Sequence, residues 1–332
     1  MRNSYLLLLV LAFILVAPFS ALSQQTITGL SADDGLDGIV EKGAPLLRIA
    51  YVASTRGELY PCATCGTNSL GGLSRRATIL KNLKAGNVPF LYLAGSEEFL
   101  SDLDTKRLTS PEWNKNAPIN LHNESQKARR LVTGHSRLGT SVGYLLPEES
   151  DWLIEYAGKI PPGFQKVASE PVSTILSTPH GKVGIVLFPK GTENNGLPSE
   201  AQIQAVLDTG KSLRDKASLI IGISPWGNVG EYRFIPKADG IYSILFGGGN
   251  GLSYTYSTEF STSSLLWVRS EFQGRAVNFL DIYEMPAPGH LPSWQEGISF
   301  IAGQTFLFLR LPPDQGMEKA IGKSADEWRK KP

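Results

Sequence analysis

The sequence predicts an α/β fold in which strands and helices alternate and then give way to strands. Short runs of Val, Ile, Leu and aromatic residues alternate with segments of helical periodicity along the first part of the chain. The later part holds mainly strand patterns, which favours a mixed sandwich built on a large sheet. Hydrophobic residues make up 42% of the chain and charged residues 19%, which is typical of a globular core and not of a disordered chain.

The first predicted unit is a strand, a helix and a second strand. Residues 46–52 are apolar apart from Arg48 and are expected to form a buried strand. After Gly71-Gly72, apolar residues recur at helical spacing over 73–83. Residues 88–94 are again apolar and form the next strand. A strand–helix–strand unit of this length predicts parallel pairing of its two strands.

The remaining elements follow in order. Residues 96–126 are polar and are expected to form a long loop or surface insert. Helices are expected at 125–137, 148–158 and 199–216, the last opened by Ser199, and strands at 140–145, 183–188, 218–224 and 240–246. The segments 264–268 and 277–283 are expected to form an antiparallel pair joined at Gly274.

The N-terminus has the pattern of a secretory signal peptide. Arg2 is followed by an apolar run over residues 6–16, and Ala21 and Ser23 supply the small residues of a cleavage site. We therefore expect a signal peptide at 1–23, a flexible lead-in at 24–45, and export to the periplasm or the extracellular space. An uncleaved N-terminal anchor is the alternative, although the run is short for a bilayer span.

Charge and hydropathy exclude some partners. The formal net charge of +1 gives no electric field that would gather nucleic acid. After the leader, the apolar stretch at 299–311 is too short for a membrane span and ends at Pro312-Pro313. The sequence identifies no partner and predicts no cofactor, although an exported redox or protein partner is compatible with it.

Four stretches stand in a distinctive order. The first is RIAYVASTRGELYPC at 48–62, followed by GGLSRRA at 71–77. The second is LAGS at 93–96, and the third is GISPWG at 222–227. The fourth is GGGNG at 247–251, followed by QGRAV at 273–277. In order and spacing they resemble the metallophosphoesterase (calcineurin-like) domain of secreted 5′-nucleotidases, in particular the UshA-like subgroup with a Pro-Cys-x-x-Cys-Gly turn.

This resemblance implies a four-layer αββα sandwich over residues 46–290, followed by a C-terminal extension at 291–332. It also implies a two-metal site at the strand ends, where carboxylates and imidazoles hold two cations that orient a water. The positions expected to hold the metals carry other residues here, which are Ser54, Arg56, Leu93, Ser96, Tyr144, Leu145, Pro225 and Asn250. Leucine and proline side chains offer no donor, and arginine brings a cation where metals need anions.

The cysteine pair is the sharpest remaining motif. Cys62 and Cys65 stand in a Cys-x-x-Cys turn, and they are the two cysteines of the chain. Gly66 stands where a c-type haem site needs histidine, and a zinc site would need a second cysteine pair. A structural disulfide, a redox-active pair and free thiols remain open.

Other ionisable residues give weaker signals. The histidines, at 122, 135, 180 and 290, are expected on the surface. The acidic residues at 97, 98, 102, 104, 148, 149 and 151 are expected to be solvated, with cation binding as the alternative. Arg75 and Arg76 are expected on an exposed helical face, or at an anion near the helix start.

Two functions remain from the sequence. The favoured one is an exported, non-hydrolytic protein of this fold that acts as a binding, scaffold or thiol-redox component. The alternative is a metal-dependent phosphoesterase or 5′-nucleotidase with an atypical metal site.

Overall fold

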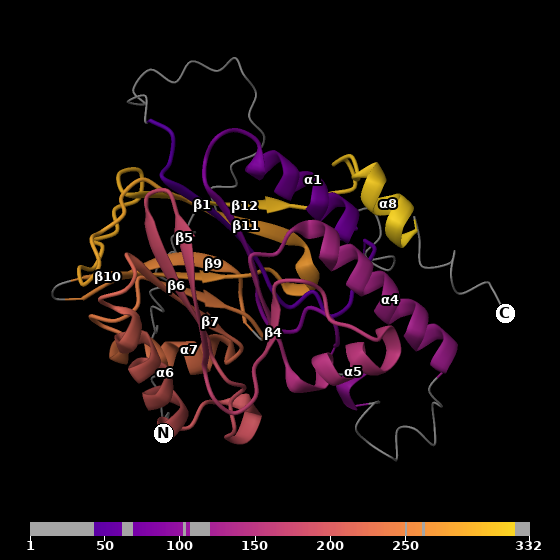
Figure 1. Cartoon of the computed structure of the whole chain (residues 1–332), viewed down its shortest axis with the longest axis horizontal. Coiled ribbons are helices and arrows are strands. Elements are labelled where there is room, and N and C mark those ends of the chain that lie inside the picture. The colour runs from indigo at the N-terminus through magenta and orange to yellow at the C-terminus, as the bar shows by residue number, and fades with distance from the viewer. Residues whose placement is uncertain are drawn as a thin grey trace, which may run out of the picture. The chain divides into compact units, whose positions relative to one another are not determined.

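The structure is a computed structural model that describes residues 43–61, 69–101, 104–106, 120–249, 251–260 and 263–322. Within these residues, two six-stranded mixed sheets pack face to face and helices cover both outer faces (Figure 1). This is a four-layer αββα sandwich, so the predicted fold class is confirmed.

The first sheet combines a parallel half with an antiparallel half. β1 pairs in parallel with β2, as predicted, and β2, β3 and β4 continue in parallel. On its other side β1 pairs antiparallel with β11, which pairs antiparallel with β12. The strands, in their order across the sheet, are β12 (Phe300–Phe306), β11 (Ala276–Ile282), β1 (Leu47–Val52), β2 (Phe90–Ala94), β3 (Val142–Leu145) and β4 (Phe164–Lys166).

The second sheet has a parallel centre and antiparallel edges. β6, β7, β8 and β10 run parallel, while the edge strands β5 and β9 run antiparallel to their neighbours. The strands, in their order across the sheet, are β5 (Val172–Thr178), β6 (Gly181–Leu187), β7 (Leu219–Ser224), β8 (Ile244–Gly247), β10 (Ser264–Arg269) and β9 (Tyr254–Glu259).

Successive side chains of a strand point to opposite faces of its sheet. Alternate residues of the central strands therefore contact either the other sheet or the covering helices. In β1, Ile49 and Tyr51 face the second sheet, while Ala50 and Val52 face the helices. In β7, Ile221 faces the first sheet and Ile220 faces the opposite helices. Both faces of these strands are apolar because both are covered.

The helices bury their apolar sides against the two sheets. The first sheet is covered by α1 (Leu73–Lys84), α4 (Leu121–Leu138), α5 (Pro147–Ala157) and α8 (Gln315–Ile321). The second sheet is covered by α6 (Glu200–Leu213) and α7 (Gly227–Phe234). The predicted start of α6 is confirmed, because Ser199 Oγ accepts a hydrogen bond from Gln202 N at 3.3 Å.

The predicted antiparallel pairing of 264–268 with 277–283 is wrong. β10 lies in the second sheet between β8 and β9, whereas β11 lies in the first sheet between β1 and β12. The connection through Gly274 therefore crosses from one sheet to the other. Ser270 secures this crossing, because its Oγ accepts a hydrogen bond from Ala53 N at 2.8 Å.

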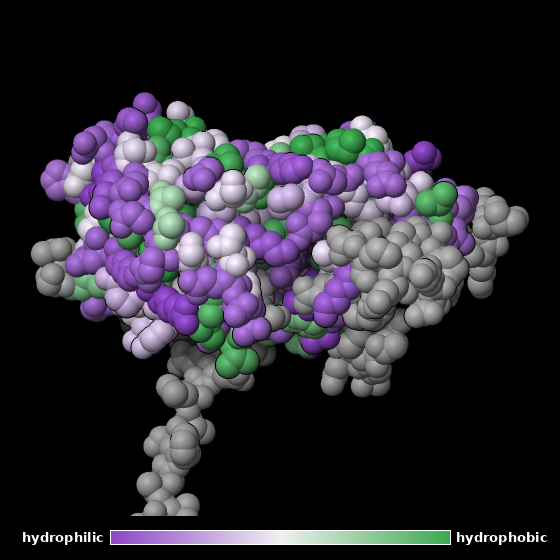
Figure 2. All heavy atoms as spheres, turned by 90° about the horizontal axis from the view of Figure 1, so that it is seen from below, coloured by the Kyte–Doolittle hydropathy of each residue, from purple (hydrophilic) through white to green (hydrophobic). Residues whose placement is uncertain are grey.

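Two elements beyond residue 290 complete the first sheet and its helix layer. β12 forms an edge of that sheet, and α8 packs on it through Met317 and Ile321. Within the described ranges, no helix has the length and hydropathy needed to cross a bilayer. On the face shown in Figure 2, hydrophilic side chains predominate and hydrophobic ones form small separate groups.

Candidate functional site

The carboxyl ends of β1, β2, β7 and β8 meet where the two sheets face each other. Gly249 N, just after β8, donates a hydrogen bond of 2.9 Å to Ser54 Oγ, just after β1. A Cβ atom built on Gly248 would lie 3.0 Å from Ser96 Oγ, just after β2, and 3.5 Å from Ser224 O at the end of β7. Two sequence-predicted positions, Ser54 and Ser96, are therefore brought together with the glycine turn at this edge.

Three residues in these loops have a left-handed backbone that side chains rarely adopt. The φ angles are 54° at Ser54, 57° at Arg56 and 60° at Glu97. Hydrogen bonds between the loops hold this conformation, since Ser54 N donates to Ser96 O at 2.8 Å and Arg56 N donates to Glu97 O at 2.7 Å. Such conformations cost about 1–3 kcal/mol each and are concentrated at functional sites, which singles out this edge.

A fully buried ion pair lies beneath the first of these loops. Arg76 Nη1 of α1 lies 2.8 Å from Glu98 Oε2, and both side chains are excluded from solvent. Thr55 completes the contact, because its hydroxyl donates to Glu98 Oε1 at 2.6 Å and accepts from Arg76 Nη2 at 2.5 Å. Both oxygens of the carboxylate and both terminal nitrogens of the guanidinium therefore take part in this contact.

A second arginine–glutamate pair lies closer to the surface. Arg56 Nη2 lies 3.1 Å from Glu97 Oε2, and both side chains are partly exposed. The Arg56 guanidinium also lies over the ring of Phe272, 4.6 Å from its centroid. Arg56 therefore occupies the loop after β1 with its charge balanced by Glu97.

A third pair lies under the glycine turn of the second sheet. Arg269 Nη1 donates to Glu231 Oε2, and Trp267 Nε1 donates to the same oxygen at 2.8 Å. Arg269 Nη2 also donates to Gly248 O at 2.9 Å. Burial raises the pKa of Glu231 to about 7, while the adjacent Arg269 charge opposes this rise.

His135 of α4 lies buried beside the first pair. Its Nε2 lies 3.9 Å from Glu98 Oε2, and its ring packs against Phe99 and Phe164. Neither ring nitrogen forms a hydrogen bond with the described residues. Burial, and next the charge of Arg76, lower the pKa of His135 well below its ordinary value, so the ring is neutral.

Glu149 of α5 ties the loop after β2 to the end of β3. Its Oε1 accepts hydrogen bonds from Phe99 N at 2.9 Å and Leu100 N at 3.2 Å, and its Oε2 accepts from Leu146 N at 3.1 Å. Burial raises the pKa of Glu149 to about 8, although these donors oppose the rise.

Other sequence-predicted positions point elsewhere. Leu93 and Tyr144 lie in the core between the sheets, and the Tyr144 hydroxyl donates to Phe188 O at 2.8 Å. Leu145 is the next residue in the strand and so faces the helices on the opposite side. Pro225 follows β7 at the site edge. Asn250, Cys62 and Cys65 lie outside the described residues.

Several surface predictions are wrong, since Arg76, Glu98, His135 and Glu149 are all buried. The helical spacing carries a usable signal for two of them. Arg76 shares a face with the apolar residues of α1, and His135 shares one with those of α4. The spacing alone does not predict burial, because charged and polar side chains are usually exposed unless they are paired. The partners that pair with these side chains lie in other segments of the chain, so the sequence does not reveal them.

Among the described residues, no group of three or more His, Cys, Asp or Glu side chains is arranged to hold a metal ion. The strand ends instead combine serine hydroxyls, a glycine turn and arginine–glutamate pairs. This arrangement can bind polar groups and fix the loops.

No protein-family model matches the sequence, and no curated protein matches it. Solved structures match its fold. A 5′-nucleotidase precursor from Thermus thermophilus matches 83% of this chain with a TM-score of 0.59 at 14% identity. The sulfate thiohydrolase SoxB from the same organism matches 84% with a TM-score of 0.60 at 11% identity. The calcineurin-like phosphoesterase YfkN from Bacillus subtilis matches 85% with a TM-score of 0.56 at 13% identity.

The matched lengths differ among these proteins. The match covers 57% of the nucleotidase and 60% of SoxB, so this chain spans less than two thirds of either protein. It covers 97% of the YfkN structure. The resemblance found in the sequence is therefore confirmed at the level of the fold, which is that of 5′-nucleotidase and calcineurin-like phosphoesterase structures.

Proposed function

We propose that this chain is an exported binding protein that uses the phosphoesterase-type fold without hydrolysing phosphoesters. The observation that supports this proposal is the set of donors at the strand ends. A two-metal site needs anionic carboxylates and neutral imidazoles around both cations. Here Ser54 and Ser96 contribute hydroxyls, while Glu97 and Glu98 are each bound to an arginine. These residues do not fit a pair of divalent cations.

Charge adds to this mismatch. Arg56 and Arg76 are permanent cations that pair with Glu97 and Glu98. The two carboxylates are therefore already neutralised and leave no net negative charge to attract a metal ion. Releasing Glu98 to a metal would leave the buried Arg76 guanidinium unpaired, which is strongly unfavourable. The ion pairs therefore replace metal binding as the interaction that holds these loops.

The test combines metal content, stability and activity of the mature protein. We expect no stoichiometric Mn, Fe, Zn or Co by elemental analysis, and no hydrolysis of para-nitrophenyl phosphate. We also expect Mn²⁺ or Zn²⁺ to leave the thermal midpoint unchanged, because a ligand that binds the folded state would raise it. Two metals per chain, together with ester hydrolysis that is lost on chelation, would establish the alternative of an atypical phosphoesterase.

Export and the cysteine pair belong to the same proposal. The leader pattern supports cleavage before Gln24, and sequencing of the exported protein should find that N-terminus. In an oxidising compartment we expect Cys62 and Cys65 to form a disulfide. The chain is anchored on both sides of them, since Leu59 O accepts a hydrogen bond from Leu73 N at 3.0 Å and Leu70 pairs with Phe308.

A glutathione titration decides the role of this pair. A structural disulfide resists reduction across the glutathione range, because such bonds have potentials below about −300 mV. Full reduction at mild potentials would instead make Cys62 and Cys65 a redox couple. Thiols that react with an alkylating reagent without any reductant would refute the disulfide itself.

A further inference from the structure

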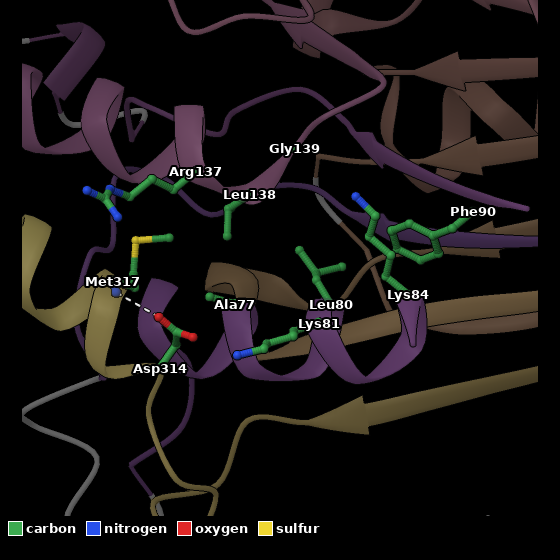
Figure 3. A pocket seen from close by; sticks show the side chains of 10 residues that line it. All are labelled: Ala77, Leu80, Lys81, Lys84, Phe90, Arg137, Leu138, Gly139, Asp314 and Met317. Carbon is green, nitrogen blue, oxygen red and sulfur yellow. Dashed lines mark hydrogen bonds between the residues drawn. The ribbon is translucent and has the colours of Figure 1, made fainter. Parts of the chain in front are cut away.

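A cavity lies at the opposite end of the first sheet from the strand-end site, which is the place near Ser54 and Ser96 where the carboxyl ends of β1, β2, β7 and β8 meet. It has a volume of about 350 Å³, is open on one side, and lies between α1, the end of α4 and α8 (Figure 3). Lys84 ends α1, Phe90 begins β2 and Gly139 precedes β3, so the cavity sits at the amino ends of these parallel strands. It is therefore separate from the loops at their carboxyl ends.

The inner wall of the cavity is apolar. Leu80, Leu138 and Met317 line it, and all three belong to the buried core under the helices. In Figure 3, Leu80 and Leu138 point toward each other across the space, and Met317 points in from α8. Ala77 and Phe90 are half-buried and widen this wall. The lining can thus contact the apolar part of a ligand.

Three exposed cations surround the apolar wall. Lys81, Lys84 and Arg137 line the cavity, and none of them forms an ion pair within the described part of the chain. Asp314 is the one carboxylate among the lining residues, and its Oδ1 accepts a hydrogen bond of 2.8 Å from Met317 N as the N-cap of α8. The rim therefore carries an excess of positive charge.

Helix ends explain part of this arrangement. Cations in the last turn interact favourably with the helix dipole, and the three basic residues occupy the last turns of α1 and α4. The dipole accounts for their position along each helix. It does not account for their gathering around one cavity whose wall is apolar.

We propose that this cavity binds a small amphipathic organic anion, with its carboxylate or phosphate at the cationic rim and its apolar body against Leu80, Leu138 and Met317. At roughly 30 Å³ per water-sized group, the volume admits a ligand of about a dozen heavy atoms. This site does not depend on the absence of hydrolysis at the strand ends.

Calorimetric titration of the mature protein tests the site with three probes. Octanoate carries both an anionic head and an apolar tail, octan-1-ol carries the tail alone, and inorganic phosphate carries charge alone. We expect octanoate to bind, with weaker binding at higher salt, and the other two probes to bind at least about tenfold more weakly. Hydrogen exchange should show protection by octanoate at α1, the end of α4 and α8.

Variants separate the rim from the wall. Lys81→Glu with Lys84→Glu should weaken octanoate binding by about tenfold, since two attractive charges become repulsive. Ala77→Trp should abolish binding by filling the cavity from a half-buried position. Lys159→Glu reverses an exposed charge outside the cavity and should leave binding unchanged.

Three results would overturn the proposal. These are a failure of octanoate to bind, equal binding of octan-1-ol or phosphate, and unchanged octanoate binding in the double charge reversal. Because para-nitrophenyl phosphate hydrolysis and metal content are measured separately, failure here leaves the strand-end proposal intact, and the converse also holds.

Discussion

Replacing Glu98 by glutamine tests whether the buried ion pair holds the loops at the strand ends. The wild-type carboxylate accepts hydrogen bonds from Arg76 Nη1 at 2.8 Å and from the Thr55 hydroxyl at 2.6 Å. A glutamine of the same shape offers one oxygen and places an amide N–H₂ group against one of these donors. Arg76 would then remain buried with its positive charge unbalanced.

The size of the loss follows from burial. The side chains of Arg76 and Glu98 are 1% and 0% exposed, so solvent cannot replace the missing charge. Breaking a buried pair by removing one partner costs about 3–5 kcal/mol. For a domain of this size, roughly 2–4 °C of thermal midpoint is lost per kcal/mol, which gives a decrease on the order of 10 °C.

Urea unfolding followed by circular dichroism measures this loss, with two controls. Asp151→Asn breaks the exposed Lys166–Asp151 pair, whose side chains are 43% and 71% exposed, and should cost less than about 1 kcal/mol. Arg76→Met with Glu98→Leu removes both charges and should cost less than Glu98→Gln alone. A Glu98→Gln protein as stable as the Asp151→Asn protein would refute the reasoning.

Three further predictions concern packing and titration, and urea unfolding tests each. Gly95→Ala should cost about 1–3 kcal/mol, because the new Cβ would lie 2.4 Å from Tyr51 Oη; Gly43→Ala, with no atom within 4 Å, should be neutral. Burial lowers the pKa of His135 in the folded state below the ordinary histidine value of 6.5. The free energy of unfolding should therefore be highest above pH 6.5 and fall as the pH drops below 6.5, and His135→Leu should remove this fall. Burial raises the pKa of Glu149 in the folded state from 4.5 to about 8. Its contribution to the free energy of unfolding should therefore be complete below pH 4.5 and be lost as the pH rises to 8. A Glu149→Gln protein whose stability falls equally over this range would show that Glu149 is not the group responsible.

The sequence by itself determined the fold class and most of the elements in the layers. Local patterns were sufficient for the α/β class and for the elements, because strand and helix periodicity depends only on neighbouring residues. The four-layer αββα arrangement was implied by the resemblance to the metallophosphoesterase domain. The parallel pairing of β1 with β2 was predictable for the same reason, since a short helix connects them. The resemblance to the metallophosphoesterase domain also implied that Ser54, Ser96 and the turn after β8 belong to one site, and the contact of Gly249 with Ser54 agrees with this.

Only the tertiary structure decided which strands β10 and β11 pair with and which charges are buried. An extended segment between two covered faces can pair in either sheet, so its own residues do not specify the partner. The burial of Arg76, Glu98 and His135 likewise depended on partners from separate segments. A charged side chain is excluded from water only where another chain segment supplies its counter-charge, and that juxtaposition exists only once the sheets and helices have packed.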